Sequence, residues 1–318
     1  MRVTRLGKIF DPTEHRFALD SVGYAQSPQV LVKDNSVRIY FSTRCLDSEE
    51  QFVSHVAYVD MTRDLRTIIG TSVHEVISQG DLGSFDEHGI FPFHVLPVGD
   101  AIYAYTCGWS RRVSVPVETG IGLAISRDQG NTFNRVGTGP IMTASLNEPF
   151  LVGDAFVRPF GSHFHMWYIF GQQWKLFEGY NAPERIYKIG HATSDDGINW
   201  TRKSGHPILA DRLGADESQA LPTVIQYGDR YHMFFCYRES VDFRSTQGRG
   251  YRLGYAVSED LISWDRRDDE LALNTFSEEW DRDMQCYPHA FECDGRVFLL
   301  YNGNEFGKYG FGALELSF

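Results

Sequence analysis

The sequence lacks any apolar segment that would cross a membrane. No stretch of the 318 residues approaches the roughly eighteen consecutive apolar residues of a membrane-spanning helix. The N-terminus, Met1 to Asp11, also lacks the apolar region of a secretory signal peptide. From this sequence we therefore expect a cytoplasmic protein with no membrane partner.

Positive charge and metal-binding motifs are scarce as well. The chain has 30 Lys and Arg against 42 Asp and Glu, for a formal net charge of −12. Nucleic-acid binding depends on basic side chains that neutralise phosphates, so we expect no nucleic-acid partner. The five cysteines are odd in number and show no CxxC spacing, which predicts free thiols and no metal site.

Helical periodicity is absent over any long stretch, but an internal repeat is present. Short apolar runs recur between turn residues, which favours an all-β class. Five segments share one pattern, in which an apolar run, a turn of Asp, Gly, Asn or Ser and an aromatic-rich run follow one another. They open at positions 28, 92, 155, 222 and 288, so successive copies lie 63 to 67 residues apart. Each reads as a β-hairpin, and the regular spacing predicts five structural repeats.

A second motif follows three of the hairpins and completes the repeat. An alternating strand ends in Ser, an acidic turn follows and an aromatic residue opens the next strand, as in residues 123–133, 191–200 and 255–264. Four strands per repeat are typical of a propeller blade. We predict an all-β, five-bladed β-propeller that forms a single domain over residues 1–318. Its blades are expected at about 16–78, 79–145, 146–210, 211–275 and 276–318.

The two ends of the chain predict how the ring closes. The last repeat stops after three strands, whereas the segment Val3 to Phe10 resembles the outer strand of the other repeats. We expect residues 1–15 to complete the fifth blade, because closure removes an exposed sheet edge.

The candidate site is the rim where strand one of each blade begins and strand two ends. Every repeat carries a carboxylate before strand one, and the candidate catalytic residues are Asp20, Asp86, Glu87, Asp154, Glu217 and Asp283. The candidate substrate-binding residues are Arg44, Trp109, Arg111, Gln173, Trp174, Lys175 and Arg238 after strand two, with His88 and His289 beside the strand-one starts. Aromatic faces stack on sugar rings while Arg and Gln bond hydroxyl groups, so this set predicts a carbohydrate substrate.

These residues also have a structural interpretation. Asp and Glu before a strand are frequent turn and capping residues. A histidine without a second ligand at a defined spacing is more often structural than metal-binding. Carboxylates near corresponding positions of five repeats nevertheless favour a functional rim.

With these residues in view, the chain resembles the five-bladed propeller glycosidases. That group comprises the arabinanase and xylosidase enzymes, the invertases and the mannoside phosphorylases. The resemblance covers nearly the whole chain, and its most specific segments are His165 to Tyr168, Tyr187 to Trp200 and Tyr251 to Ser258. It implies the architecture more firmly than the reaction, because fold does not fix function.

The resemblance implies three carboxylates, on blades one, three and four, that act as base, as modulator of the acid's pKa and as general acid. Asp154 looks like the modulator. Glu217 matches the acid in part, because it stands further from Pro222 than the family's Glu stands from its proline. Blade one departs from the pattern, since Ser27 precedes Pro28 where the family has its base, and Asp20 would have to act from a displaced loop.

Three functions stay open at this point. The first is a glycoside hydrolase-like enzyme, although inverting hydrolysis needs both an acid and an ionised base. The second is a glycoside phosphorylase with phosphate as co-substrate, which needs only an acid and a cationic pocket from Arg44, Arg111, Arg238 or Lys175. The same arginines suit an acidic sugar. The third is a carbohydrate-binding or glycan-processing propeller without hydrolysis.

Overall fold

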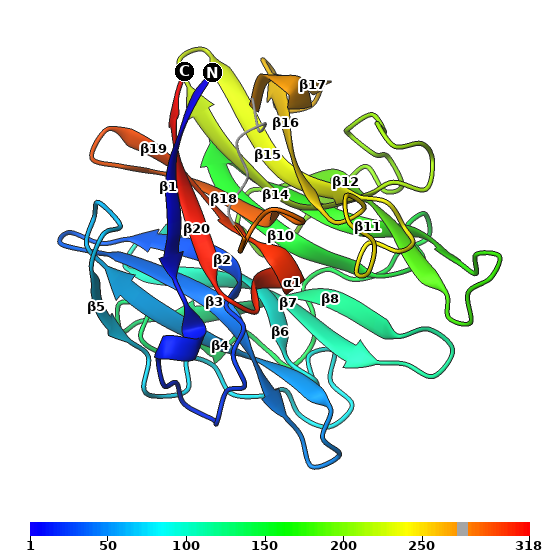
Figure 1. Ribbon diagram of the computed structural model, residues 1–318, viewed down its shortest axis with the longest axis horizontal. Coiled ribbons are helices and arrows are strands. Elements are labelled where there is room, and N and C mark those ends of the chain that lie inside the picture. The colour runs from blue at the N-terminus through cyan, green and yellow to red at the C-terminus, as the bar shows by residue number, and fades with distance from the viewer. Residues whose placement is uncertain (272–278) are drawn as a thin grey trace.

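The protein forms a ring of five four-stranded antiparallel sheets in a computed structural model that describes residues 1–271 and 279–318 (Figure 1). Blade one contains β2 (Gln26–Val32), β3 (Val37–Leu46), β4 (Phe52–Met61) and β5 (Ile68–Thr71). Blade two contains β6 (Ile90–Val98), β7 (Ala101–Arg111), β8 (Val117–Ser126) and β9 (Asn134–Arg135). Blade three contains β10 (Val152–Phe160), β11 (His163–Lys175), β12 (Glu184–Ser194) and β13 (Thr201–Arg202). Blade four contains β14 (Ser218–Tyr227), β15 (Arg230–Arg238), β16 (Arg252–Ser258) and β17 (Asp265–Arg266). These sheets confirm the predicted five-bladed propeller.

Blade five closes the ring with both ends of the chain. It contains β18 (Cys286–Cys293), β19 (Arg296–Asn302), β20 (Phe311–Ser317) and the N-terminal strand β1 (Arg2–Phe10). Strand β1 pairs antiparallel with β20 from Arg2 opposite Ser317 to Phe10 opposite Phe311, so the two termini lie side by side (Figure 1). The predicted closure by the N-terminal strand is therefore confirmed. The expected boundary between blades four and five, at residues 275 and 276, lies outside the described residues.

Helical structure is confined to short turns in the described ranges. They are the 3₁₀ helices Pro12–Glu14 and Asp268–Leu271 and the single turn α1 (Asn304–Gly307). None of these described helices is long and apolar enough to cross a membrane. All five cysteines are free and buried.

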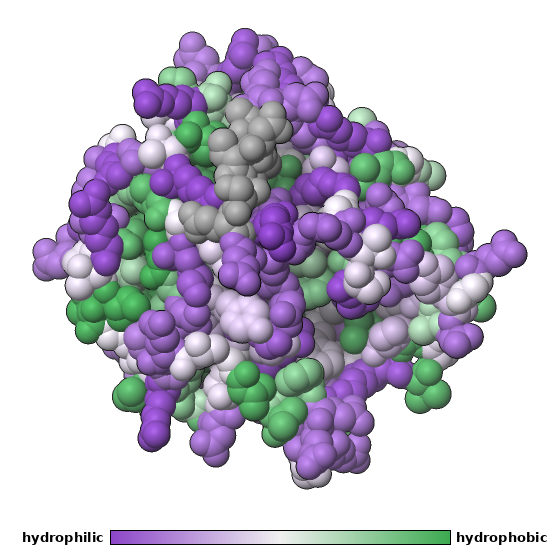
Figure 2. Space-filling model, in the orientation of Figure 1, coloured by the Kyte–Doolittle hydropathy of each residue, from purple (hydrophilic) through white to green (hydrophobic). Residues whose placement is uncertain are grey.

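The hydrophobic core lies between adjacent blades, as expected when sheets stack face to face around an axis. Phe41 of blade one packs with Phe298 of blade five, and Tyr105 of blade two packs with Tyr168 of blade three. Large buried side chains such as Trp167 fill the spaces between blades three and four. The face shown in Figure 2 is mainly hydrophilic, and its hydrophobic side chains form small separate groups.

The first strands β2, β6, β10, β14 and β18 surround the axis and share one irregularity. In each, the pairing with strand two shifts by one residue, at 26–29, 90–93, 153–156, 220–223 and 286–289. The residues that open these bulges are Ser27, Phe91, Asp154, Leu221 and Tyr287. A β-bulge re-aims the side chain that it contains, so the five bulges form a ring of redirected residues at one end of the channel.

Candidate active site

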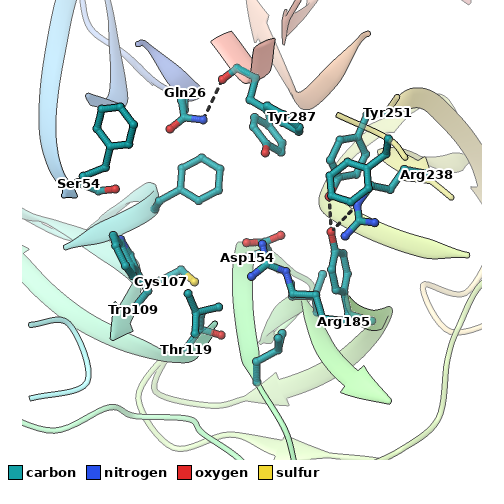
Figure 3. A pocket seen from close by; sticks show the side chains of 18 of the residues that line it. Gln26, Ser54, Cys107, Trp109, Thr119, Asp154, Arg185, Arg238, Tyr251 and Tyr287 are labelled. Atoms are coloured by element: carbon teal, nitrogen blue, oxygen red, sulfur yellow. Dashed lines mark hydrogen bonds between the residues drawn. The ribbon is translucent and has the colours of Figure 1, made fainter. Parts of the chain in front are cut away.

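A cavity of about 290 Å³ opens at this ring of bulges and is lined by all five blades (Figure 3). Blade one contributes Gln26 and Arg44, blade two Trp109, blade three Asp154 and blade five Tyr287. Gln26 and Ser54 lie across the cavity from Asp154 and Arg185 in this view, whereas Arg238 and Tyr251 of blade four lie to one side (Figure 3). The cavity occupies the rim that the sequence predicts for the site.

Asp154 is the one carboxylate that lines this cavity among the described residues. Its backbone has φ 53°, a left-handed conformation that Asp tolerates better than most residues, and the bulge aims its side chain at the cavity. Burial raises the pKa of Asp154 to about 7, against the lowering effects of a hydrogen bond from the Leu221 backbone and the charge of Arg185. A carboxyl group that holds its proton near neutral pH is suited to act as a general acid.

Four arginines line the same cavity, namely Arg44, Arg185, Arg238 and Arg244. Only Arg244 forms an ion pair with a carboxylate in the described parts of the chain, at 3.0 Å from Glu184. Arg44 donates to the Gln26 amide oxygen at 3.0 Å, and its guanidinium lies 4.4 Å from the centre of the Tyr24 ring. The cavity is therefore cationic although the whole chain is acidic, and it suits a ligand that brings negative charge.

Aromatic rings form much of the remaining wall. Trp109, Phe91 and Tyr287 line the side of blades two and five, and the Phe91 and Tyr287 rings meet edge to face with centres 5.1 Å apart. On the side of blades three and four, the Tyr187 and Tyr251 hydroxyl groups share a short hydrogen bond. Ring faces beside polar hydroxyl groups are what a sugar needs for stacking and hydrogen bonding.

A second compartment of about 500 Å³ adjoins the cavity. The two share Arg44, Phe243, Arg244 and Phe306, so they form a continuous depression. Asp283, a predicted catalytic residue, lines this second compartment and accepts a hydrogen bond from Gln247 at 2.9 Å. A ligand longer than one sugar unit would extend into this space.

Two other predicted catalytic carboxylates belong to a structural clamp that four blades repeat. In each clamp, a buried carboxylate ahead of strand one pairs with an arginine of the outer strand of the same blade. The pairs are Asp86–Arg135 at 2.7 Å, Glu148–Arg202 at 2.8 Å, Glu217–Arg266 at 2.7 Å and Asp281–Arg5 at 2.6 Å. The structure therefore places Asp86 and Glu217 in the packing between strands and not at the cavity.

Glu217 is the most completely bonded of these carboxylates. One oxygen accepts from Arg266 and Gln219, and the other accepts from the backbone N–H groups of Arg212 and Leu213. Burial raises the pKa of Glu217, but the hydrogen bonds and charge of Arg266 outweigh this effect and lower the pKa below its ordinary value. A carboxylate held ionised in this way is a poor proton donor.

The structure places the other carboxylates and the rim residues of blade three away from the cavity. Asp20 is exposed and does not line it, and the Glu87 carbonyl oxygen accepts from Gln79 at 2.7 Å. Gln173 is exposed on the β11–β12 hairpin, and Trp174 packs against the core. Lys175 forms an ion pair with Asp216 at 2.6 Å.

Arg111 and the two predicted histidines also have structural partners. Arg111 pairs with Asp47 at 2.8 Å. The His88 ring lies beside Trp109, with centres 5.5 Å apart, and burial lowers its pKa. His289 is buried in the channel wall, where its Nε2 accepts from the Val30 N–H at 3.2 Å. Of the predicted site residues, the cavity thus unites Asp154, Arg44, Trp109 and Arg238.

Several lining residues were not predicted from the sequence. Phe91 and Tyr287 stand directly before Pro92 and Pro288, two of the residues used to align the repeats. The position before each aligned residue could therefore have been predicted to line the cavity. Arg185 is the second residue of β12, the third strand of its blade, which begins at the same rim where strand two ends. Arg244 lies in the loop between β15 and β16, where the residues follow no recurring pattern.

Comparison with known proteins finds relatives of the whole chain. No protein-family model matches the chain. The Mycobacterium tuberculosis proteins MT1551 and Rv1502, both described as uncharacterized, are each 30% identical over 313 residues, which is 98% of either chain.

Similar folds occur in solved structures of carbohydrate-active proteins. A protein described as a glycoside hydrolase has a TM-score of 0.72 at 17% identity and covers 99% of this chain and 92% of its own. A β-1,2-mannobiose phosphorylase from Listeria innocua, in complex with β-1,2-mannobiose, has a TM-score of 0.66 at 11% identity, with 100% and 97% covered. A thermostable family-43 glycoside hydrolase has a TM-score of 0.63 at 15% identity, with 95% and 92% covered. The resemblance to this superfamily is thereby confirmed for the fold.

Proposed function

The chain belongs to the family of the mycobacterial proteins MT1551 and Rv1502, and we propose that it is an enzyme that breaks a glycosidic bond with Asp154 as general acid. The observation that carries the proposal is the position of Asp154, the one described carboxylate that lines the cavity, where burial raises its pKa to about 7. Its proton would pass to the glycosidic oxygen, so that the leaving sugar departs as an alcohol. The similarity in fold to glycoside hydrolases and to a phosphorylase is consistent with this role.

The nucleophile in this proposal is phosphate. Inverting hydrolysis needs a second carboxylate about 6.5 to 9.5 Å from the acid, and retention needs one at about 5 to 5.5 Å. Within residues 1–271 and 279–318, Asp154 is the one carboxylate that lines the 290 Å³ cavity, while Asp283 and Glu305 line only the adjoining compartment. Ser27 and Leu221 open the bulges of blades one and four. Phosphate is already an oxyanion and needs no protein base.

In the proposed reaction a phosphate oxygen forms a bond to the anomeric carbon as the bond from that carbon to the glycosidic oxygen breaks. The proton from Asp154 ends on the leaving oxygen, and the proton of the hydrogen phosphate is released and restores Asp154. Because the nucleophile approaches from the face opposite the acid, it would enter on the side of blade one. Gln26 lies on that side (Figure 3) and offers an amide, and Arg44, which donates to the Gln26 amide oxygen, offers a cation.

Turnover with and without phosphate tests the proposal. Aryl glycosides and disaccharides would be incubated with the protein, and sugar phosphate and free sugar measured separately. We expect product only when phosphate is present. Equal release of free sugar without phosphate would contradict the phosphate step. Saturable sugar binding without any product would contradict the enzymatic function and favour a carbohydrate-binding propeller.

A further inference from the structure

Arg238 is a buried cation that has no carboxylate ion-pair partner among the described residues. The residue is 1% exposed at the end of β15. Its Nε donates to the Tyr187 hydroxyl at 3.3 Å, and its Nη1 donates to the Glu239 carbonyl oxygen at 2.8 Å. The guanidinium lies 3.5 Å from the centre of the Phe243 ring. No carboxylate of the described residues forms an ion pair with Arg238; the Tyr251 side chain also hydrogen-bonds the guanidinium, and Glu184 acts on it only at longer range.

Arg38 is a buried arginine with a structural role, and its ion-pair partner provides a comparison with Arg238. Arg38 is 4% exposed and pairs with Asp60 through two hydrogen bonds of 2.8 and 2.7 Å. Burial of a charge without a counter-ion is strongly unfavourable, so proteins pair buried guanidinium groups with carboxylates or with ligands. Arg238 lines the cavity, and its missing counter-ion therefore points to a ligand anion.

The position of Arg238 indicates which anion this is. It belongs to blade four, beside Arg185 and on the flank of the cavity next to Asp154, whereas Gln26 and Ser54 face Asp154 from blade one (Figure 3). A nucleophile must approach the anomeric carbon from the face opposite the acid. An anion at Arg238 lies on the wrong side for attack and is held instead against the Tyr187 and Tyr251 hydroxyl groups.

We propose that the substrate sugar carries its own oxyanion, a carboxylate or a phosphate ester, and that Arg238 binds it. The Arg238 guanidinium donates to the anion, and Arg185 adds a second positive charge in the same wall. This inference rests on the proposed function, because it names the substrate class of that same cavity. Arg238 would thus select acidic sugars, while Arg44 on blade one remains for the nucleophile.

Calorimetry with defined sugars tests the inference without requiring turnover. The probes are glucuronate and galacturonate, glucose 6-phosphate and galactose 6-phosphate, neutral glucose and galactose, and inorganic phosphate. We expect one acidic class to bind about tenfold to a hundredfold more tightly than its neutral parent, as a charge-assisted hydrogen bond provides. The uronates and the sugar phosphates distinguish the two sources of the anion.

Substitution of Arg238 assigns the preference to this side chain. Arg238→Gln should abolish the preference for the acidic sugar, so that the acidic sugar and its neutral parent bind with similar affinity. Arg63→Gln removes a remote arginine that pairs with Asp294 and should change neither. Because a buried charge without a counter-ion is unfavourable, Arg238→Gln should keep or raise the melting temperature, whereas Arg38→Gln should lower it, since it leaves the partly buried Asp60 without its partner. Should Arg238→Gln fail to fold, Arg185→Gln takes its place in the binding assay.

Two results would overturn the inference. One is equal binding of acidic and neutral sugars; the other is Arg238-dependent binding of inorganic phosphate with no preference for acidic sugars. The outcomes separate this inference from the proposed function. Tight binding of an acidic sugar without turnover would support the inference and contradict the proposed enzymatic function. Turnover of a neutral substrate by Arg238→Gln at the wild-type rate would support the enzymatic function and contradict the inference.

Discussion

Asp154 and Glu217 are both buried carboxylates at the start of the first strand in neighbouring blades, yet their surroundings are opposite. Glu217 accepts four hydrogen bonds and pairs with Arg266, and its pKa is lowered. Asp154 faces the cavity, and burial raises its pKa to about 7. Glu217 is held ionised as part of the blade, while Asp154 keeps a proton that it can donate.

The arginines repeat this contrast. Arg266 is one of four outer-strand arginines that compensate a buried carboxylate, whereas Arg238 faces the cavity without such a partner among the described residues. Charged residues near the rim therefore do not by themselves identify the site of this propeller. The residues that identify it are those without an ion-pair partner among the described residues. Substitution of the two kinds of carboxylate tests that distinction.

Asp154→Asn should have the largest effect. Removing the proton donor should lower kcat for glycosyl transfer by about 10² to 10⁴, the usual contribution of general acid catalysis. The melting temperature should be unchanged or higher, because the substitution removes a buried ionisable group. Steady-state kinetics and thermal unfolding check both parts; a variant that retains wild-type kcat would show that Asp154 is not the acid.

Glu217→Gln should produce the reverse pattern. The change leaves Arg266 buried without its full counter-charge, which costs roughly 3 kcal/mol of unfolding free energy. Activity per folded molecule should remain near that of the wild type, since Glu217 does not line the cavity. Chemical denaturation measures the first effect and kinetics the second. Glu148→Gln, which removes the equivalent carboxylate of blade three, is the matched control. A large loss of kcat in Glu217→Gln but not in Glu148→Gln would show that Glu217 takes part in catalysis.

The pH dependence should separate the two carboxyl groups in the same way. Activity requires protonated Asp154, so it should fall about tenfold per pH unit above roughly pH 7 and level off below it. The folded state keeps a proton that the unfolded chain releases near its ordinary pKa of 3.8, so the Asp154 contribution to stability should decrease as pH rises from about 4 to 7.

Glu217 contributes in the opposite direction, because its folded pKa is lowered. Its stabilising effect should be present above its ordinary pKa of 4.5 and be lost as the pH falls through the lower folded value. Unfolding free energies of the wild type, Asp154→Asn and Glu217→Gln across this range give the two contributions by difference. Identical pH profiles for the two variants would contradict the assignment.

The sequence predicted the fold well because the propeller is a repeat whose turns, alternation and spacing are local patterns. Closure by residues 1–15 was also visible, since β1 shares its outer-strand pattern with the other blades. The site was predicted only in part. Asp86, Asp154 and Glu217 look alike before a strand, and only the position of Arg135 or Arg266 in three dimensions shows which carboxylate is compensated.

The histidine and loop residues illustrate a second limit. His289 stands two residues after the cavity residue Tyr287, but the β-bulge at 286–289 interrupts the alternation of β18, and His289 lies in the channel wall, where it accepts a backbone hydrogen bond. Arg244 reaches the cavity from a loop of blade four and pairs with Glu184 of blade three. Such contacts join distant parts of the chain, so no short-range pattern encodes them.

Asp20→Asn should have the smallest effect and completes the comparison. Asp20 is the blade-one carboxylate that would replace the missing base, but it is exposed and does not line the cavity. We expect stability to change by less than about 0.5 kcal/mol, as for surface substitutions, and kcat/KM to stay within about twofold. A loss comparable to that of Asp154→Asn, measured under the same phosphate concentration, would mean that the loop before β2 closes over the substrate and supplies a base. The reaction would then be hydrolysis with two carboxylates, Asp154 and Asp20. In that case an exposed carboxylate that becomes buried when substrate binds would also belong to the site.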